Sequence, residues 1–391
     1  MIRRIKIANF LSFGSDCEEI SIKGLNVVIG NNGVGKTCFI EAIDLLRKAP
    51  SFQEFSNKLR KMGDNLLHRG PDGRPATLEF SLDNMDKSTK GNYPELLYKI
   101  SFVYENQMLR ISEEKLTGLG NGYEYQYYDS NNGMPRIRVD NEMVDLGPDR
   151  LAPCQSFLSF YKTYLHYPVI AALAAELEKI KIYRNWTFGS ETLMHQPQKT
   201  DVPRKFLEEN FSNIPLVLNS LEFFGFKNKI LEHLQYFYPI LQDYFVNIER
   251  GVAQVYFREK GLSAPVSQLS DGLLHYLCLI CILLNPDAPP LICIETPEVG
   301  LHPDILARIG NITKEASISR RCRIIVTTHS TDLVNALTSS AGDVLFAEKG
   351  ESGTRIARKN KEKSAFEEGG SVSNMWTPGP VNPNMRRGPI Q

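Results

Sequence analysis

One short stretch, residues 30–37, constrains the fold of this chain more than any other. It reads Gly-Asn-Asn-Gly-Val-Gly-Lys-Thr, which matches the phosphate-binding pattern G-x-x-x-x-G-K-[ST]. The apolar run Leu25–Ile29 before it predicts a buried strand, and Cys38–Lys48 after it has apolar residues at helical spacing. This order predicts a P-loop, because glycines let backbone N–H groups approach a phosphate and a helix N-terminus attracts its charge.

The residue types in this loop predict separate tasks. Lys36 is expected to reach the β- and γ-phosphates of a nucleotide, and the Thr37 hydroxyl is expected to hold Mg²⁺. The residues expected to bind the nucleotide are Gly30, Asn31, Asn32, Gly33, Val34, Gly35, Lys36, Thr37 and Cys38.

Composition narrows the class of protein. The 391 residues contain 45 Lys+Arg and 45 Asp+Glu, so no global basic field indicates nucleic-acid binding, although a local basic surface stays open. Seven scattered cysteines suit a reducing compartment, and we interpret Cys278 and Cys281 as core residues. Residues 1–10 lack the apolar stretch of a signal peptide, and Leu273–Leu284 is too short to cross a bilayer. We expect a cytoplasmic protein with no membrane segment.

The first 151 residues alternate in a way that predicts strands. Turn residues separate the apolar alternations, and a partly helical stretch at 50–64 follows the P-loop helix. The result is a P-loop lobe with an antiparallel β-layer beside the nucleotide. The predicted strands are Ile2–Ala8, Glu18–Ile22, Ala76–Leu82, Leu96–Tyr104, Gln107–Ile111, Tyr123–Tyr128 and Arg136–Val139.

The remainder divides into three predicted parts. Residues 152–244 look mostly helical, with many aromatic residues that we interpret as core. Residues 245–366 return to strands, and we expect them to form a second lobe. Residues 367–391 are rich in Gly, Pro, Asn and Ser around Trp376, and we expect a flexible tail. Expected strands in the second lobe are Phe245–Arg250, Gln254–Arg258, Leu291–Glu295, Arg323–Thr328, Asp343–Ala347 and Thr354–Ala357.

Three further motifs carry chemistry. Ser270, in Leu269-Ser-Asp-Gly272, lies where the N-cap of an apolar helix is expected, and free N–H groups there can bind an anion. Glu295 ends a buried strand, where a carboxylate can hold Mg²⁺. His329 follows the strand 323–328, at the sheet edge where catalytic groups collect. A plain helix cap and a surface histidine are the alternatives to the first and third interpretations.

In this order, the P-loop, Gln155, Leu-Ser-Asp-Gly, Leu-Ile-Cys-Ile-Glu and Val-Thr-Thr-His-Ser resemble the ABC-type ATPases of the RecF/SMC kind. More narrowly, the chain is similar to short, coiled-coil-free "AAA family" ATPases of bacterial defence systems. The resemblance implies an α/β ATPase head with a mostly parallel central sheet, an antiparallel β-layer and an inserted helical subdomain. It also implies ATP and Mg²⁺ as cofactors.

The resemblance implies roles for individual residues. Ser270 and Gly272 of one subunit would close over the ATP held by the P-loop of the other, so that a homodimer encloses two ATP molecules. Gln155 would contact the nucleotide and its metal, together with Thr37 and Glu295. Lys36, Glu295, Glu298 and His329 would make up the catalytic set.

Three positions depart from the family pattern. Leu11 stands where the family usually has Arg after Asn-Phe, and His275 stands where Arg commonly follows the signature. Thr296 replaces the carboxylate expected after the metal-binding acid, and threonine cannot take a proton from water as a carboxylate can. We therefore expect slow hydrolysis, with Glu298 as the nearest substitute base.

These inferences leave three functions open, and the third of them is a scaffold that binds ATP without turnover. The first is an ATP-dependent switch that dimerises on ATP and controls a separate effector protein, in antiphage defence. The alternative is a RecF-like repair or recombination ATPase that contacts DNA directly.

Overall fold

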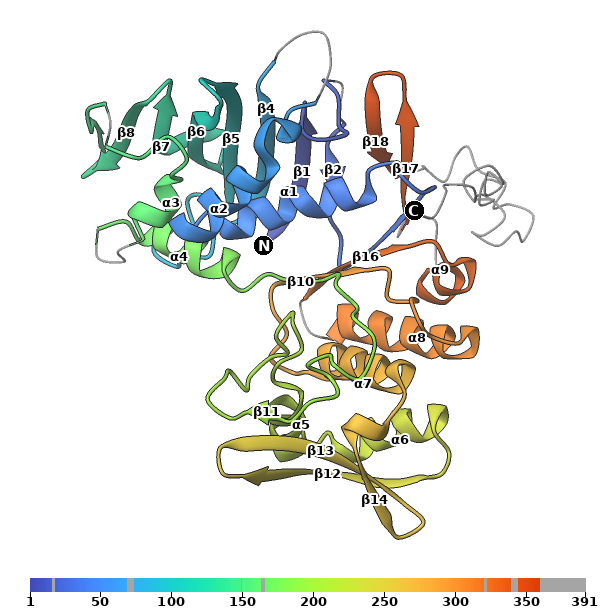
Figure 1. The fold of residues 1–391 in the computed structure, drawn as a ribbon. Helices are drawn as coiled ribbons and strands as arrows, with labels where there is room; N and C mark the ends of the chain where they lie inside the picture. The colour runs from blue at the N-terminus through green and yellow to red at the C-terminus, as the bar shows by residue number, and fades with distance from the viewer. Residues whose placement is uncertain are drawn as a thin grey trace.

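The computed structural model describes residues 1–15, 18–68, 74–148, 150–162, 166–319, 322–338 and 344–358. An antiparallel sheet covers one side of the molecule, a mostly parallel sheet lies in the middle, and a helical layer with a third small sheet follows (Figure 1). This arrangement confirms the predicted α/β fold with an antiparallel β-layer. The predicted tail at 367–391, with Trp376, lies outside the described residues.

The antiparallel layer has the strand order β2-β1-β4-β5-β6-β7-β8-β9. Apart from β1 and β4, each strand lies beside its neighbour in sequence, as the short turns between them predict. The strands are β1 (Ile2–Ala8), β2 (Ile20–Ser21), β4 (Ala76–Asp83), β5 (Glu95–Glu105), β6 (Met108–Gly120), β7 (Tyr123–Asn131), β8 (Met134–Val139) and β9 (Glu142–Asp145).

The central sheet has the order β10-β15-β16-β3-β17-β18. All its pairs are parallel except β17 with β18, which form the predicted closing hairpin. The strands are β3 (Leu25–Ile29), β10 (Lys181–Tyr183), β15 (Leu291–Glu295), β16 (Arg323–Thr328), β17 (Val344–Gly350) and β18 (Gly353–Ala357).

Two hydrophobic cores lie on the two faces of the central sheet. Successive side chains of a strand point to opposite faces, so Val28 joins the core shared with the antiparallel layer, whereas Val27 and Ile29 join the other. The first core contains α1 and the second contains α7. The helices are α1 (Lys36–Lys48), α2 (Phe52–Met62), α3 (Phe157–Phe160), α4 (Pro168–Leu177), α5 (Ile214–Phe223), α6 (Lys227–Phe237), α7 (Asp271–Leu284), α8 (Pro303–Ser319) and α9 (Thr331–Leu337).

Residues 152–244 are less helical than predicted. They contain α3 to α6, but also β10 of the central sheet. They further supply β11 and the start of β12 to the small sheet. Strand β10 has only three residues and is held in the sheet by parallel pairing with β15. Such a short strand has no alternating pattern from which it could be predicted. The remaining strands are β11 (Gln198–Lys199), β12 (Leu241–Glu249), β13 (Val252–Glu259) and β14 (Leu262–Pro265).

Candidate functional site

The carboxyl ends of three parallel strands bring the predicted motifs to one edge of the central sheet. In the ladder, Glu295 on β15 is opposite Thr327 on β16, and Thr328 is opposite Ile29 on β3. The P-loop therefore begins beside the strand end that carries His329 and one strand away from Glu295. Ligands of open α/β sheets bind at this edge.

The P-loop, which lies between β3 and α1, packs against Thr354 of β18 and against Ser12. Gly35 has a φ of 102°, and a Cβ atom there would lie 2.3 Å from Thr354 Oγ1 and 2.5 Å from Ser12 Oγ. Thr354 Oγ1 lies 2.7 Å from Ser12 Oγ and 2.8 Å from the Val34 carbonyl oxygen. Glycine is thus required both by the left-handed backbone and by the close approach of β18.

A pocket of about 230 Å³ opens over the P-loop. It brings together much of the predicted site, whereas Gly30, Asn31 and Val34 of the loop do not line it. The residues that line the pocket are Asn32, Gly33, Gly35, Lys36, Thr37, Cys38, Glu295, Thr296, Thr327 and His329.

The Lys36 ammonium group lies against the loop. Its Nζ donates to the carbonyl oxygens of Gly30 and Asn31, both at 2.8 Å. Burial lowers the pKa of Lys36 to about 8, although the carboxylates of Glu295 and Glu298 oppose that effect. The group is therefore mostly charged at pH 7, as a phosphate-binding lysine must be.

Lys36→Ala is expected to weaken ATP binding about ten- to a hundredfold. A hydrogen bond to a charged group contributes about 1.5–3 kcal/mol, and about 1.4 kcal/mol corresponds to tenfold in affinity. Since the pKa of Lys36 is about 8, binding by the parent protein should weaken as pH rises above that value, while the variant should not respond. Equilibrium dialysis at several pH values measures both effects, and equal affinities of parent and variant would contradict the assignment.

Thr37 and Glu295 meet at the mouth of the pocket. The Thr37 hydroxyl donates directly to Glu295 Oε1. A hydroxyl and a carboxylate oxygen are ligands that Mg²⁺ accepts, and this ion commonly keeps several waters beside one or two protein groups. The residues present thus fit Mg²⁺, which Thr37 and Glu295 would hold.

The residues after β15 and β16 are tied to each other. Glu298 Oε1 accepts hydrogen bonds from Thr328 Oγ1 and from His329 N, both at 2.8 Å. Burial, with help from the nearby Lys36 charge, lowers the pKa of His329, so its imidazole is neutral at pH 7. Thr296 lines the pocket with a φ of 49°, an uncommon conformation for a β-branched residue.

Gln155 is not brought to this pocket. Its Oε1 accepts from Ala152 N at 3.2 Å, and the residues after it are held by the antiparallel layer. Buried Glu114 on β6 accepts from Ser156 Oγ at 2.6 Å and Phe157 N at 3.0 Å. These contacts place Gln155 in another cavity, which Glu114 and Tyr128 also line. Gln155 does not line the P-loop pocket in this structure, and its contact with nucleotide and metal stays a prediction.

Ser270 and Gly272 also lie apart from the P-loop pocket of their own chain. Ser270 caps α7, with its Oγ accepting from Leu273 N at 3.3 Å, and its side chain is exposed. A Cβ atom at Gly272 would lie 3.0 Å from the Gly300 carbonyl oxygen. Helix α7 is on the opposite face of the central sheet from α1 (Figure 1). A contact with the P-loop of the same chain therefore does not account for the predicted role of Ser270 and Gly272.

The other two residues that depart from the family pattern, Leu11 and His275, pack against the hydrophobic interior. Leu11 packs partly buried against the core beneath the antiparallel layer. His275 is fully buried and its ring lies 4.0 Å from that of Trp186, centroid to centroid. Cys278 and Cys281 are fully buried too, which agrees with their interpretation as core residues.

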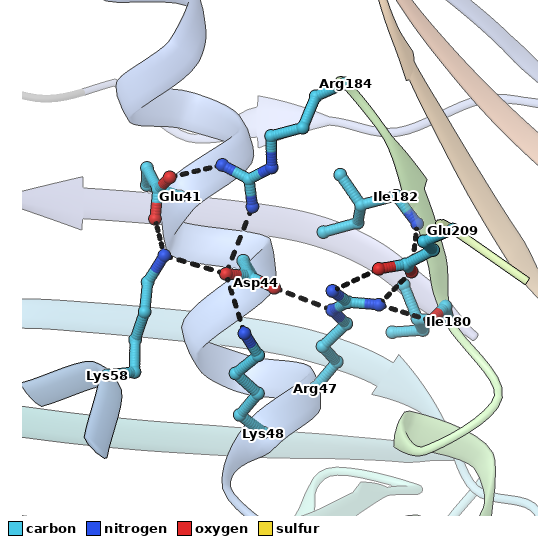
Figure 2. Close-up of polar contacts among 9 residues, drawn as sticks. All are labelled: Glu41, Asp44, Arg47, Lys48, Lys58, Ile180, Ile182, Arg184 and Glu209. Carbon is cyan, nitrogen blue, oxygen red and sulfur yellow. Dashed lines mark hydrogen bonds and ion pairs between the residues drawn. The ribbon is translucent and has the colours of Figure 1, made fainter. Parts of the chain in front are cut away.

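Arg184 and Trp186, directly after β10, are site neighbours that the sequence interpretation missed. Trp186 Nε1 donates to the Glu295 carbonyl oxygen at 2.7 Å. Arg184 reaches back to α1, where it pairs with Glu41 and with Asp44 (Figure 2). The available signal was a basic residue directly after the short stretch Ile180-Lys-Ile-Tyr183.

Figure 2 shows Asp44 of α1 among cations from several elements. Its carboxylate is 1% exposed and lies 2.7 Å from Arg47, 2.8 Å from Lys58 and 3.0 Å from Arg184. Burial alone would raise the pKa of Asp44, but the cations, above all Arg47, outweigh it and hold the pKa well below its usual range. The helix that carries the P-loop is thereby fixed to α2 and to the residue after β10.

Asp44→Ala is expected to lower the free energy of unfolding by about 3–5 kcal/mol, because it removes the buried carboxylate that Arg47, Lys48, Lys58 and Arg184 share. Since the pKa of Asp44 is lowered in the folded protein, its contribution is present above the unfolded value of about 4 and lost as pH falls below it. Urea unfolding at pH 7 and at pH 3 tests both statements. Equal stability of parent and variant at pH 7 would contradict them.

No group of three or more His, Cys, Asp or Glu side chains that could hold a metal is present in the described part of the chain. None of the helices there is long and apolar enough to cross a membrane.

Two family models match the chain. The model described as "AAA ATPase domain" matches residues 1–238, and the model described as "AAA domain, putative AbiEii toxin, Type IV TA system" matches residues 201–335.

Two curated relatives match shorter stretches. The DNA double-strand break repair Rad50 ATPase of Sulfurisphaera tokodaii is 44% identical over 90 residues, which is 22% of this chain and 9% of that protein. Structural maintenance of chromosomes protein 3 of Caenorhabditis elegans is 28% identical over 158 residues, 39% of this chain and 11% of that protein. The matched stretches thus span about a tenth of each relative.

Solved structures of SMC heads share the fold. An Smc head bound to the C-winged helix domain of ScpA gives a TM-score of 0.58 at 12% identity, covering 93% of this chain and 99% of that one. An Smc head with an extended coiled coil, bound to the C-terminal domain of ScpA derived from Pyrococcus furiosus, gives 0.53 at 10% identity, covering 91% and 95%. The expected ABC-type ATPase head of the RecF/SMC kind is confirmed as the fold.

Proposed function

Because the chain belongs to the AAA ATPase domain family, we propose that it is an ATP-driven switch that closes into a head-to-tail homodimer around two ATP molecules. The observation that carries this proposal is the separation of two complementary half-sites. The P-loop pocket collects Lys36, Thr37 and Glu295, whereas the exposed Ser270 cap lies outside that pocket. A second copy of the chain can supply the missing half.

Each side chain has a role in this proposal. Lys36 holds the β- and γ-phosphates, Thr37 and Glu295 hold Mg²⁺, and Ser270 with the first N–H groups of α7 binds the γ-phosphate of the partner's ATP. The bound Mg²⁺ neutralises phosphate charge. Glu298 orients His329 through the backbone N–H of that residue. Hydrolysis is slow, because Thr296 offers no carboxylate to the attacking water.

Sedimentation velocity with and without Mg²⁺ and ATP tests the proposal. A monomer that becomes a dimer with ATP, and returns as ATP is hydrolysed, is the expected result. The same sedimentation coefficient in both conditions, at ATP concentrations that dialysis shows to saturate the P-loop, would contradict it.

The finer part of the proposal is control of a separate effector protein in antiphage defence, in the cytoplasm. It is supported by the resemblance to defence ATPases and by the similar Smc head whose structure includes a bound ScpA domain. A tagged chain should retain this effector in the presence of ATP and release it in the Lys36→Ala variant. Equal retention of the effector by the parent and by Lys36→Ala would contradict its control by ATP.

Direct action on DNA is the second candidate, because one curated relative is a DNA double-strand break repair ATPase. Phosphate contacts make DNA affinity fall steeply with salt. Binding to a duplex at several salt concentrations separates the two candidates, since an effector switch should show no such affinity.

A further inference from the structure

Residues 184–189 form a segment that contacts three separate parts of the ATPase. We call this stretch, which leaves β10 at the sheet edge, the bridging segment. At its start, Arg184 pairs with Glu41 and Asp44 on the P-loop helix α1 (Figure 2). At its end, Gly189 N donates to Asp271 Oδ1 at 2.8 Å, in the first turn of α7.

Trp186, in the middle of this segment, contacts the strand end that carries the metal-binding carboxylate. Its Nε1 donates to the Glu295 carbonyl oxygen at 2.7 Å, and its ring packs on His275 of α7. With 9% of its surface exposed, this side chain is nearly buried. Trp186 therefore lies in contact with both the end of β15 and α7.

Helix α7, which begins at the predicted signature Leu269-Ser-Asp-Gly272, also contacts the loop after Glu295. His275 Nδ1 donates to the Val299 carbonyl oxygen at 2.8 Å. Phe188 packs over Gly300, because a Cβ atom at Gly300 would lie 3.0 Å from the Phe188 ring. A Cβ atom at Gly272 would in turn lie 3.0 Å from the Gly300 carbonyl oxygen. The bridging segment and residues 299–300 thus contact each other and both contact α7.

We propose that the bridging segment couples the P-loop pocket of a subunit to α7 of the same subunit, whose Ser270 would contact the ATP bound by the partner. Trp186 is the positioning residue. The proposal rests on the ATP-driven dimer proposed above. ATP bound at one pocket would then set the position of Ser270 at the other. Couplings between two sites in one protein are typically about 5- to 150-fold in affinity.

Trp186→Phe keeps an aromatic ring against His275 but deletes the hydrogen bond to Glu295. It is expected to leave ATP affinity of the monomer within about twofold and to weaken ATP-dependent dimerisation at least about fivefold. Tyr183→Phe is the matched control, because it deletes a 2.5 Å hydrogen bond to the Leu207 carbonyl oxygen in the same aromatic cluster. Thermal unfolding shows whether each variant is folded.

A second measurement uses Trp186 itself as the reporter. The chain has two tryptophans, so Trp376→Phe leaves Trp186 alone. When combined with Ser270→Arg, which blocks dimerisation, Trp186 emission should change with ATP at the concentration where dialysis shows binding.

The outcomes are separable. If the parent does not dimerise with ATP, the proposed function fails. If the parent dimerises and Trp186→Phe dimerises equally well, or if ATP binds without changing Trp186 emission, the coupling is overturned. Equal losses in Trp186→Phe and Tyr183→Phe would also overturn it, since they would reflect general loosening of the cluster.

Discussion

Thr296→Glu is expected to raise the rate of ATP hydrolysis about 10²–10⁴-fold, the usual contribution of a positioned general base. Residue 296 lines the pocket beside Glu295 and has a φ of 49°. That backbone conformation is less strained for glutamate than for a β-branched threonine. Phosphate release under saturating ATP measures the effect. Thr296→Gln has the same shape without the base, so equal rates for the two variants would contradict the prediction.

Glu298 is the other carboxylate that bears on this rate. Its Oε1 already accepts from Thr328 and His329, which favours orientation of the histidine over proton transfer. Glu298→Gln retains an oxygen for both donors and is expected to keep most activity, whereas Glu298→Ala should lose it. A loss of a hundredfold or more in Glu298→Gln would instead identify Glu298 as the base.

Ser270→Arg is expected to abolish ATP-dependent dimerisation while leaving ATP binding by the monomer intact. Two hydrogen bonds at each of two phosphates, at about 1.5–3 kcal/mol each, exceed the roughly 5.5 kcal/mol that a shift from 1:99 to 99:1 requires. A bulky cation at the exposed cap would block all of them. Light scattering with and without ATP measures the loss.

Ser51→Arg is the matched control for this variant. Ser51 caps α2, with its side chain accepting from Glu54 N, just as Ser270 caps α7. Each substitution removes a helix cap, at about 1 kcal/mol, but only position 270 belongs to the predicted signature. Equal dimerisation of the two variants would contradict a role for Ser270.

Much of the site was predictable because its motifs are local. The P-loop glycines, Lys36 and Thr37 fall in one turn, and Glu295 and His329 each end an apolar strand. Parallel pairing then brings these strand ends together, which an α/β pattern predicts.

The rest depends on contacts between residues far apart in sequence. Gln155 directly precedes a stretch held by Glu114, and no spacing rule reveals that this buried carboxylate accepts from the backbone of Phe157. Trp186 reaches Glu295 only because the short strand β10 pairs with β15. Residues 152–244 were therefore predicted as helical, and the contribution of β10 to the site was missed.

Mixing two inactive variants tests the central claim most directly. Lys36→Ala lacks a working P-loop and Ser270→Arg lacks a working signature, so each alone should neither dimerise with ATP nor hydrolyse it above background. The ATP concentration is chosen to fill the parent P-loop but not the weakened P-loop of Lys36→Ala. In a head-to-tail pair, the P-loop of the second variant meets the intact Ser270 of the first, which restores one of the two composite sites. The account predicts that the mixture regains ATP-dependent dimers and hydrolysis. A mixture no more active than the sum of its parts would contradict it.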